Sequence, residues 1–369
     1  MAGVYGDSTR SVKASGAEEV PGSPIVPPPV PAAAYHIPAS EDDSLDSYGR
    51  YHNPTWRHLE SALAELEGAA AALTFGSGMA AITSALRALT RPGATLVVPA
   101  DGYYQVRRYA VEYLAPQGIT VIEAKCADMV DAADGADVVL AETPSNPGLD
   151  VVDLYRLAMT CREGGATLIV DNTTATPLGQ QPLSLGADLV VASATKALSG
   201  HHDLLAGYVA GSRVEQMAAI EHERRLAGPI LGVFEAWLVL RSIGTAGLRF
   251  ERQCQNALAI ALALRTHPGV RFLRYPGLPD DPSHEIANRQ MKRFGGIVAI
   301  ELESAAAVHA MLRNSNLLVS STSFGGIHSS VDRRARWGDP VGEGFARISA
   351  GIEDTDDLVA DIEQALARP

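Results

Sequence analysis

Between residues 95 and 192 the sequence repeats one pattern, in which short apolar runs bounded by turn residues alternate with helical segments such as 153–161. The apolar runs lie at 95–99, 119–123, 138–141, 167–170 and 189–192. Runs that are apolar throughout are typical of strands buried on both faces, and the intervening helices supply the cover. The pattern predicts an α/β fold with a mostly parallel central sheet, in which ligands bind outside the carboxyl ends of the strands.

Other helices are expected before and after this region. Two precede it, at 58–73 (HLESALAELEGAAAAL) and 79–89 (MAAITSALRAL). After about residue 240 the elements are a helix at 248–266, apolar runs at 296–302 and 317–321, a helix between them at 305–313, and a final helix at 354–367. Asp354 is the expected N-cap of that last helix. This part of the sequence predicts a smaller α+β domain.

Residues 1–55 are rich in Pro, Ser and Gly, with Pro27, Pro28, Pro29 and Pro31 nearly consecutive. Such a stretch disfavours helix, and we expect an extended arm that another domain or subunit orders. At 369 residues the chain exceeds what one hydrophobic core usually organises. We therefore expect an arm at 1–55, an α/β domain at 56–240 and a C-terminal α+β domain at 241–369.

The overall charge and the cysteines exclude several classes of protein. A net charge of −13 argues against nucleic acid or an anionic membrane as the main partner. Cys126, Cys161 and Cys254 are far apart and form no CxxC pair, as in a reduced protein without a disulfide framework or structural zinc. No apolar run is long enough for a membrane span, and the N-terminus lacks the apolar core of a signal peptide. A cytoplasmic protein is expected.

Lys196 is the first candidate for chemistry. It follows the apolar run at 189–192 in the segment Ser193-Ala194-Thr195-Lys196. Partial burial at a strand end lowers the pKa of a lysine and makes its amine a nucleophile for carbonyl groups. The hydroxyls of Ser193 and Thr195 are candidate donors to a phosphate. Taken alone, this segment fits an ordinary surface lysine better.

Two further segments suggest a site around that lysine. Asp171 ends the run TLIVD, where an acid can pair with a pyridinium nitrogen, although taken alone an N-cap or turn Asp fits better. Ser77, Gly78 and Met79 open an expected helix whose free N–H groups suit a phosphate, but a small-residue helix entry without a ligand is the alternative. A phosphate cradle, an acid and a lysine in this order are improbable by chance.

Together with further segments, these residues resemble the cystathionine γ-synthase / γ-lyase family of pyridoxal 5′-phosphate (PLP) enzymes of fold type I. The similar segments span nearly the whole chain: YGRYHNPTWRHLE (48–60), GSGMAA (76–81), ADGYYQVRR (100–108), ETPSNP (142–147), DNT (171–173), SATK (193–196), STSFGG (321–326) and FARISAGIEDTDDL (345–358). The resemblance implies PLP as the cofactor, a sulfur-containing amino acid (a small molecule) as the substrate and a homotetramer built from two dimers.

The resemblance also implies the role of each matching residue. Lys196 would form the Schiff base and act as the base, and Tyr103 would stack on the PLP ring and pass a proton to the leaving sulfur. Cofactor binding is implied for Tyr48 and Arg50 (from the neighbouring subunit), Gly78, Met79, Tyr103, Asn146, Asp171, Ser193, Thr195 and Lys196. Substrate binding is implied for Arg347 and Ser323 at the α-carboxylate, Arg108 at a distal carboxylate, and position 322.

Departures from the family pattern affect the substrate. Thr322 stands where many cystathionine-handling members carry Glu, and Tyr104-Gln105 stands where many relatives have Gly-Gly. We expect cystathionine γ-lyase-type cleavage to cysteine, 2-oxobutanoate and ammonia. Cystathionine γ-synthase and a broad C–S lyase are the close alternatives. A catalytically silent PLP-fold binding protein is the alternative from another class.

Two other chemistries find little support in the sequence. A nucleotide-dependent dehydrogenase would need a G-x-G-x-x-G segment after a first strand, and none is present. The adjacent residues His201, His202 and Asp203 resemble a metal-ligand cluster, but neighbours in a chain rarely point at the same ion. A structural role in a loop fits them better, and no metal is expected.

Overall fold

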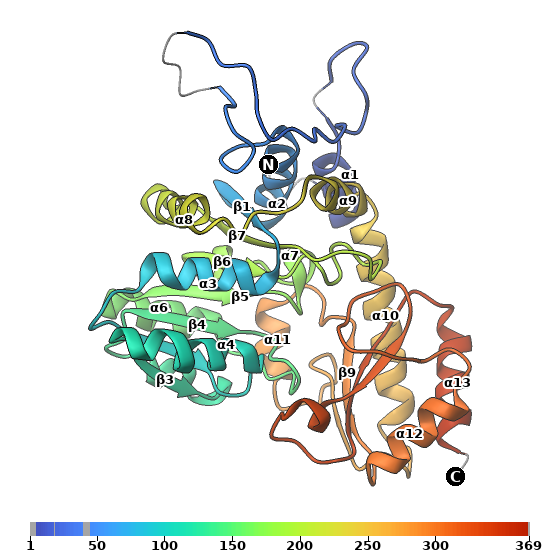
Figure 1. The fold of residues 1–369 in the computed structure, drawn as a ribbon. Helices are drawn as coiled ribbons and strands as arrows, with labels where there is room; N and C mark the ends of the chain where they lie inside the picture. Colours follow the sequence, from blue (N-terminus) through green and yellow to red (C-terminus); the bar gives the residue numbers. More distant parts are fainter. Residues whose placement is uncertain (1–4, 18, 40–44, 368–369) are drawn as a thin grey trace.

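The computed structural model describes residues 5–17, 19–39 and 45–367, so residues 1–4, 18 and 40–44 of the expected arm lie outside it. Its larger sheet has seven strands (Figure 1). In spatial order they are β1 (Ala71–Phe75), β7 (Gly207–Gly211), β6 (Leu189–Ala192), β5 (Thr167–Asp171), β4 (Val138–Glu142), β2 (Thr95–Pro99) and β3 (Thr120–Ala124). The strands from β6 to β3 are parallel, as predicted, while β7 is antiparallel to both of its neighbours.

Both faces of the central strands of this sheet are covered, which explains their uninterrupted apolar runs, whereas the edge strand β3 is largely exposed. Along β2, Leu96 and Val98 join the core cluster that includes Ile82 of α3 (Gly78–Leu89), whereas Val97 joins the cluster that includes Leu157 of α6 (Leu154–Gly164). Alternate side chains of one strand therefore face opposite layers of helices.

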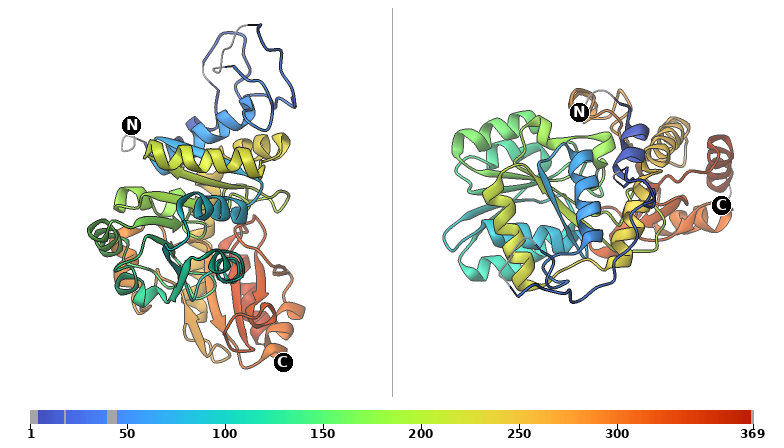
Figure 2. Two further views of the ribbon diagram at one scale, coloured as in Figure 1. Left: turned by 60° about the vertical axis from the view of Figure 1, so that its left-hand side comes forward. Right: turned by 90° about the horizontal axis from the view of Figure 1, so that it is seen from above.

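The smaller sheet lies beside the larger one and has five strands (Figure 2). In order they are β10 (Val319–Ser320), β11 (Ser330–Arg333), β12 (Phe345–Ser349), β9 (Ile297–Glu301) and β8 (Phe272–Arg274). Three helices share its core: α10 (Ala246–Leu264), α12 (Ala305–Asn314) and α13 (Thr355–Leu366). Besides α1 (Asp7–Ala14) and several short 3₁₀ or π segments, the other helices of the described chain are α2 (Pro54–Glu67), α4 (Tyr104–Tyr109), α5 (Met129–Ala132), α7 (Thr176–Gly179), α8 (Val214–Ala227), α9 (Val233–Ile243) and α11 (His284–Gln290).

Two local predictions are wrong. The arm contains a helix, α1 (Asp7–Ala14). The prolines begin only at Pro21, so the segment DSTRSVKA contains no residue that prevents helix formation. Its Arg10 is buried and donates hydrogen bonds to the backbone carbonyls of Glu65 and Leu66. The helix expected over 58–73 ends early, because Gly68 caps α2 in the left-handed conformation (φ +70°) and the following residues form β1.

Other predictions concern the arm, the domains and the final helix. Residues 19–39 contain neither helix nor strand. Parts of this stretch form loops that project from the body of the molecule (Figure 1), whereas Pro27 is buried and its carbonyl accepts a 3.1 Å hydrogen bond from the ring N–H of Trp237. Asp354 occupies the N-cap position of α13, although its side chain accepts no capping hydrogen bond. The division at 55 and 240 stays a prediction. No helix within the described ranges is long and apolar enough to cross a membrane.

Glu67, at the end of α2, is buried against the larger sheet and accepts a 2.5 Å hydrogen bond from the hydroxyl of Tyr208 on β7. Burial raises the pKa of this carboxyl from 4.5 to about 7. The folded protein therefore holds a proton that the unfolded chain releases near pH 4.5, and this carboxyl should cost stability progressively as the pH rises from about 4.5 to about 7.

Substitution of Glu67 by Gln tests this. At pH 8 the variant should have a higher free energy of unfolding than the wild type, by up to about 3 kcal/mol, and at pH 4.5 the two should be similar. Urea unfolding of both proteins at the two pH values measures the difference. Equal differences at the two pH values would contradict the assignment.

Candidate active site

The site lies at the carboxyl ends of the parallel strands, where acidic and hydroxyl side chains meet. Glu142 ends β4 and Asp171 ends β5, and the two residues are partners in the sheet register. Ser193 follows β6, the next strand in the sheet. Because parallel strands end at one edge, residues distant in sequence are gathered there.

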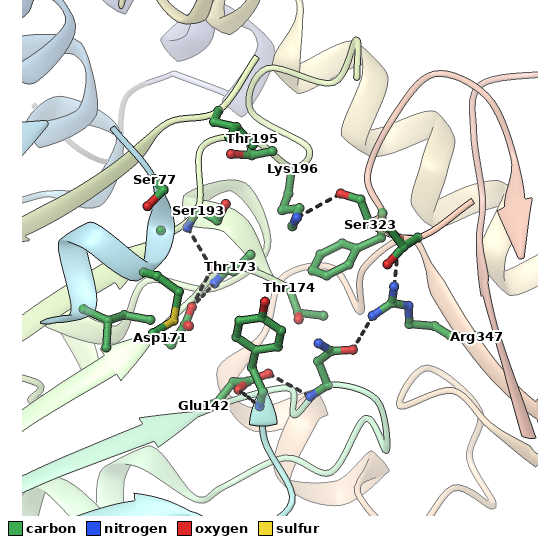
Figure 3. Close-up of a pocket in the computed structure, with 18 of the residues that line it drawn as sticks. Ser77, Glu142, Asp171, Thr173, Thr174, Ser193, Thr195, Lys196, Ser323 and Arg347 are labelled. Carbon is green, nitrogen blue, oxygen red and sulfur yellow. Dashed lines mark hydrogen bonds between the residues drawn. The ribbon is translucent and has the colours of Figure 1, made fainter. Parts of the chain in front are cut away.

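A cavity of about 420 Å³ opens at this edge, between the two sheets (Figure 3). The candidate residues that line it are Gly78, Met79, Tyr103, Asn146, Asp171, Ser193, Thr195, Lys196, Thr322, Ser323 and Arg347. Ser77, which opens α3 beside Gly78, lines it as well. Other lining residues, which the sequence did not single out for a role, are Ile82, Glu142, Thr173, Thr174, Leu205, Phe324 and Arg334.

Lys196 points into this cavity, where its Nζ donates a 2.8 Å hydrogen bond to the Ser323 hydroxyl and lies 5.3 Å from the centre of the Phe324 ring. Burial, and then the positive charge of Arg347, lower the pKa of Lys196 from 10.5 to about 8. A substantial fraction of the amine is therefore neutral near physiological pH. A neutral amine is what attack on a carbonyl or removal of a proton requires.

Asp171 and Glu142 form a pair of buried carboxyls. Burial raises the pKa of Asp171, whereas hydrogen bonds from Thr173 and the charge of Lys196 oppose that rise. Burial and the negative charge of Asp171 raise the pKa of Glu142 well above its usual range. Because each negative charge disfavours the other, ionisation of one carboxyl favours protonation of its neighbour. A cation beside Asp171 would favour the state in which Asp171 is ionised and Glu142 is protonated.

The hydrogen bonds of these two carboxyls differ. The backbone N–H and the hydroxyl of Thr173 donate to one oxygen of Asp171, at 2.9 and 2.5 Å. Glu142 accepts from the backbone N–H of Tyr103 at 2.6 Å and from that of Asn146 at 2.8 Å. One glutamate thereby fixes the segments that carry two other cavity residues. Its position directly after the apolar run 138–141 was the available sequence signal.

The N-terminus of α3 faces the segment that precedes Lys196. Ser77 caps this helix by accepting a 3.0 Å hydrogen bond from the N–H of Ala80. A Cβ added to Gly78 would lie 2.7 Å from the Cβ of Ser193, so glycine permits the close approach. The Thr195 hydroxyl donates to the carbonyl of Ala206 at 3.1 Å, and it would have to change partner to donate to a phosphate.

Arg347, on β12, supplies the cationic end of the cavity. Its guanidinium donates to the Asn146 side-chain oxygen and, at 2.8 Å, to the carbonyl of Ser323, and it lies 3.5 Å from Asp332. Burial, and next the charge of Arg334, lower its pKa to about 10. Its buried Nε has no hydrogen-bond partner among the described residues. A buried donor without a partner suits a site that binds an anionic ligand.

Three candidate residues do not line the cavity. Tyr48 is largely exposed, and Arg50 donates a 2.5 Å hydrogen bond to the carbonyl of Arg225. Their role at a neighbouring subunit stays a prediction. Arg108 is exposed, because its position on α4 directs it toward Glu112, at 3.0 Å. The structure thus gives Arg108 no contact with the substrate site of its own chain.

The metal-ligand cluster suggested by His201, His202 and Asp203 finds no geometry to match. The ring of His202 stacks on that of His328, with centroids 6.5 Å apart. In the parts of the chain that the structure describes, no group of three or more His, Cys, Asp or Glu side chains is placed to hold a metal ion.

Comparison with known proteins agrees with this geometry. The family model of Cys/Met metabolism PLP-dependent enzymes matches residues 8–367. A Streptomyces coelicolor protein provisionally named a cystathionine gamma-lyase is 50% identical, over 98% of this chain and 93% of its own length. Cystathionine gamma-lyase of Bacillus subtilis is 38% identical, over 90% of this chain and 92% of its own.

A solved structure confirms the fold. Cystathionine gamma synthase of Xanthomonas oryzae pv. oryzae, in complex with cystathionine, superposes with a TM-score of 0.93 at 33% identity, covering 98% of each chain. The α/β architecture with a mostly parallel sheet, predicted as PLP fold type I, is confirmed.

The residues present fit PLP. An amine with a pKa near 8 suits its aldehyde, and a buried carboxyl that forms no salt bridge within the described residues suits its ring nitrogen. The N-terminus of α3, opened by Gly78, suits its phosphate.

Proposed function

Because this chain belongs to the Cys/Met metabolism PLP-dependent enzymes, we propose that it is a cystathionine γ-lyase. With the uptake of water it would cleave the C–S bond of cystathionine and release cysteine, 2-oxobutanoate and ammonia. The names of the relatives at 50% and 38% identity support this substrate. The observation that carries the chemistry is the convergence of Lys196 and Arg347 on Ser323, which brings a base and a carboxylate-binding group to one residue.

Lys196 would hold the cofactor and then, once free, remove and return protons at the substrate. Its depressed pKa and its position in the cavity support both tasks. Bound PLP supplies an electron sink for the electrons left at the substrate's α-carbon. Asp171 would face the ring nitrogen, where its negative charge keeps that nitrogen protonated. Tyr103 would stack on the ring and donate a proton to the departing sulfur.

The remaining cavity residues would position the cofactor and substrate. The backbone N–H groups of Gly78 and Met79, with the hydroxyls of Ser193 and Thr195, would bind the phosphate. Arg347, oriented by Asn146 and Ser323, would clamp the α-carboxylate of the substrate and fix its α C–H bond. Thr322 would line the distal end of the substrate site.

We further infer a cytoplasmic homotetramer, a dimer of dimers, in which Tyr48 and Arg50 reach the phosphate of a neighbouring subunit. The location of both residues outside their own cavity supports this. The arm at 1–55, the PLP-binding domain at 56–240 and the C-terminal domain at 241–369 would be the units of each subunit. Their two separate sheets support the last division.

A product assay tests the proposed reaction. Purified enzyme incubated with cystathionine should release 2-oxobutanoate and cysteine in equal amounts, which 2-oxo acid and thiol measurements detect. A cystathionine γ-synthase would instead form cystathionine from cysteine and an O-acylhomoserine much faster than it cleaves it. Thiol amino acids cleaved more efficiently than cystathionine would indicate a broad C–S lyase. Absence of every reaction from PLP-loaded protein would favour a silent binding protein.

A further inference from the structure

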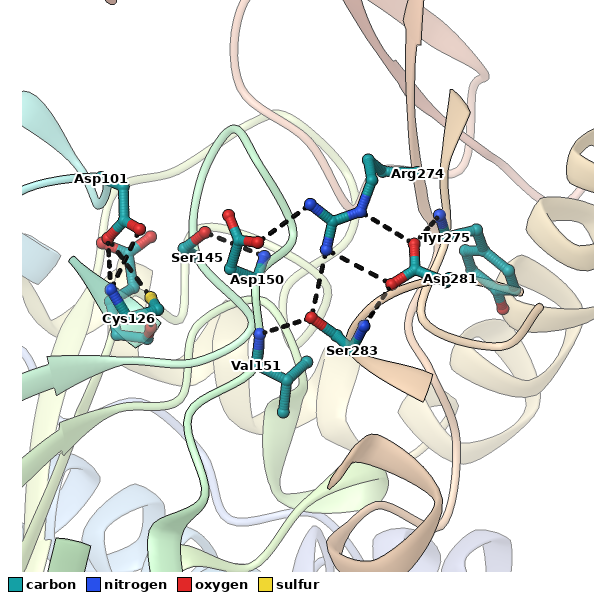
Figure 4. Close-up of polar contacts among 10 residues, drawn as sticks. Asp101, Cys126, Ser145, Asp150, Val151, Arg274, Tyr275, Asp281 and Ser283 are labelled. Carbon is teal, nitrogen blue, oxygen red and sulfur yellow. Dashed lines mark hydrogen bonds and ion pairs between the residues drawn. The ribbon is translucent and has the colours of Figure 1, made fainter. Parts of the chain in front are cut away.

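The segment that joins β4 to α6 is held by the smaller sheet at two points. At the first, Arg347 on β12 donates to the side chain of Asn146. At the second, Arg274 at the end of β8 donates a 2.9 Å hydrogen bond to Asp150 (Figure 4). The proposed substrate-binding arginine and a second arginine therefore contact the same short loop.

Hydrogen bonds within the loop link these two points. The N–H of Ser145 donates to the carbonyl of Asp150 at 2.9 Å, and the Ser145 hydroxyl accepts from the N–H of Asp150 at 3.1 Å. The N–H of Leu149 donates to the carbonyl of Ser145, also at 2.9 Å. Asp150 and Asn146 thus lie on one closed turn. A shift at Asp150 is expected to move Asn146 as well.

Arg274 is itself fixed from several sides (Figure 4). Its Nε donates to Asp281 at 2.9 Å, and its Nη2 donates to the Ser283 hydroxyl at 3.1 Å. That hydroxyl also accepts a 3.1 Å hydrogen bond from the N–H of Val151, in the same loop. The side chains of Arg274 and Asp281 are 10% and 1% exposed, whereas that of Asp150 is 37% exposed. Asp150 can therefore be changed without leaving the buried pair unmatched.

We propose that Asp150 and Arg274 are positioning residues for substrate-carboxylate recognition. Their ion pair fixes the loop that holds Asn146, and Asn146 orients the guanidinium of Arg347. This inference rests on the proposed function, in which Arg347 binds the α-carboxylate. Bidentate recognition of a carboxylate depends on the angle of the guanidinium plane, so a small rotation weakens binding while the amine-binding side of the site is unchanged.

Ligand binding to the PLP-loaded enzyme tests the proposal without turnover. Titration with L-alanine and with L-alaninamide, which lacks the carboxylate, gives two dissociation constants from the change in the visible PLP spectrum. The dissociation constant of L-alaninamide divided by that of L-alanine is a ratio that measures carboxylate recognition. In Asp150→Ala this ratio should fall about 10-fold relative to the wild type, through weaker binding of L-alanine alone. In Asp150→Asn, which keeps a hydrogen-bond acceptor, the ratio should fall less.

Two further variants complete the experiment. Arg289 forms another ion pair, at 3.1 Å, with Asp153 at the N-terminus of α6. Arg289→Met removes this ion pair and should leave the ratio unchanged. Arg347→Met should abolish the preference for the carboxylate. A lost preference in Arg347→Met with a wild-type ratio in Asp150→Ala would overturn the positioning role alone. A wild-type ratio in both variants would overturn it together with the assignment of Arg347.

Discussion

Replacement of Lys196 by Ala should lower kcat for cystathionine cleavage by about 10⁴-fold or more. The substitution removes an amine that points into the cavity, whose pKa near 8 suits both covalent attachment and proton transfer. The visible absorbance that PLP acquires when a lysine holds it should disappear as well. Steady-state release of 2-oxobutanoate and an absorbance spectrum of the purified variant measure the two effects.

Lys292→Ala is the matched control, because Lys292 is exposed and its amine lies 3.9 Å from Asp7, away from the cavity. That variant should keep both the spectrum and the activity of the wild type. Turnover by Lys196→Ala within about 10-fold of the wild type would exclude Lys196 as the base, since general acid–base catalysis contributes about 10²- to 10⁴-fold.

Asp171→Asn should lower kcat/KM by about 10²- to 10³-fold. Loss of one partner from a buried charge pair costs about 2–5 kcal/mol, and each 1.4 kcal/mol is tenfold. The amide keeps the shape of the side chain and still accepts from Thr173, so the fold should be preserved. What the variant loses is the negative charge that would keep the ring nitrogen protonated.

The control for this substitution is Asp137→Asn. Asp137 also accepts a backbone hydrogen bond, from Thr95 at 2.7 Å, but it precedes β4 and so lies at the opposite end of that strand from Glu142. Steady-state kinetics and thermal unfolding of both variants separate chemistry from stability. Equal activity in Asp171→Asn and Asp137→Asn would contradict a role for the Asp171 charge.

The central strands could be predicted from sequence because burial on both faces makes them apolar throughout. β1 and β7 were missed because their sequences lack this pattern. AALTF follows a helix rich in alanine, and GYVAG contains two glycines, so neither resembles a buried strand locally. Their strand conformation comes from antiparallel pairing with each other, a contact between residues more than a hundred positions apart. Such pairing leaves no local pattern in a single sequence.

Some residues of the site could likewise be predicted from sequence and others could not. Lys196, Asp171 and Arg347 lie in motifs whose resemblance to the family could be recognised, and the structure places all of them at one cavity. Arg334 was missed because only the short helix after β11 brings it there, where it pairs with Asp332 and Asp339. Tyr48 and Arg50 lie outside the cavity of their own chain, and the role predicted for them requires a neighbouring subunit.

The central claim is that Lys196 holds the cofactor, and reductive labelling tests it most directly. Borohydride treatment of the PLP-loaded enzyme fixes PLP to the amine that carries it, and peptide mass spectrometry then locates the added mass. The lysines of the chain are Lys13, Lys125, Lys196 and Lys292, so the outcomes are few. The added mass is expected on the peptide that contains Lys196. Labelling of another lysine, with Lys196 unmodified, would contradict the account.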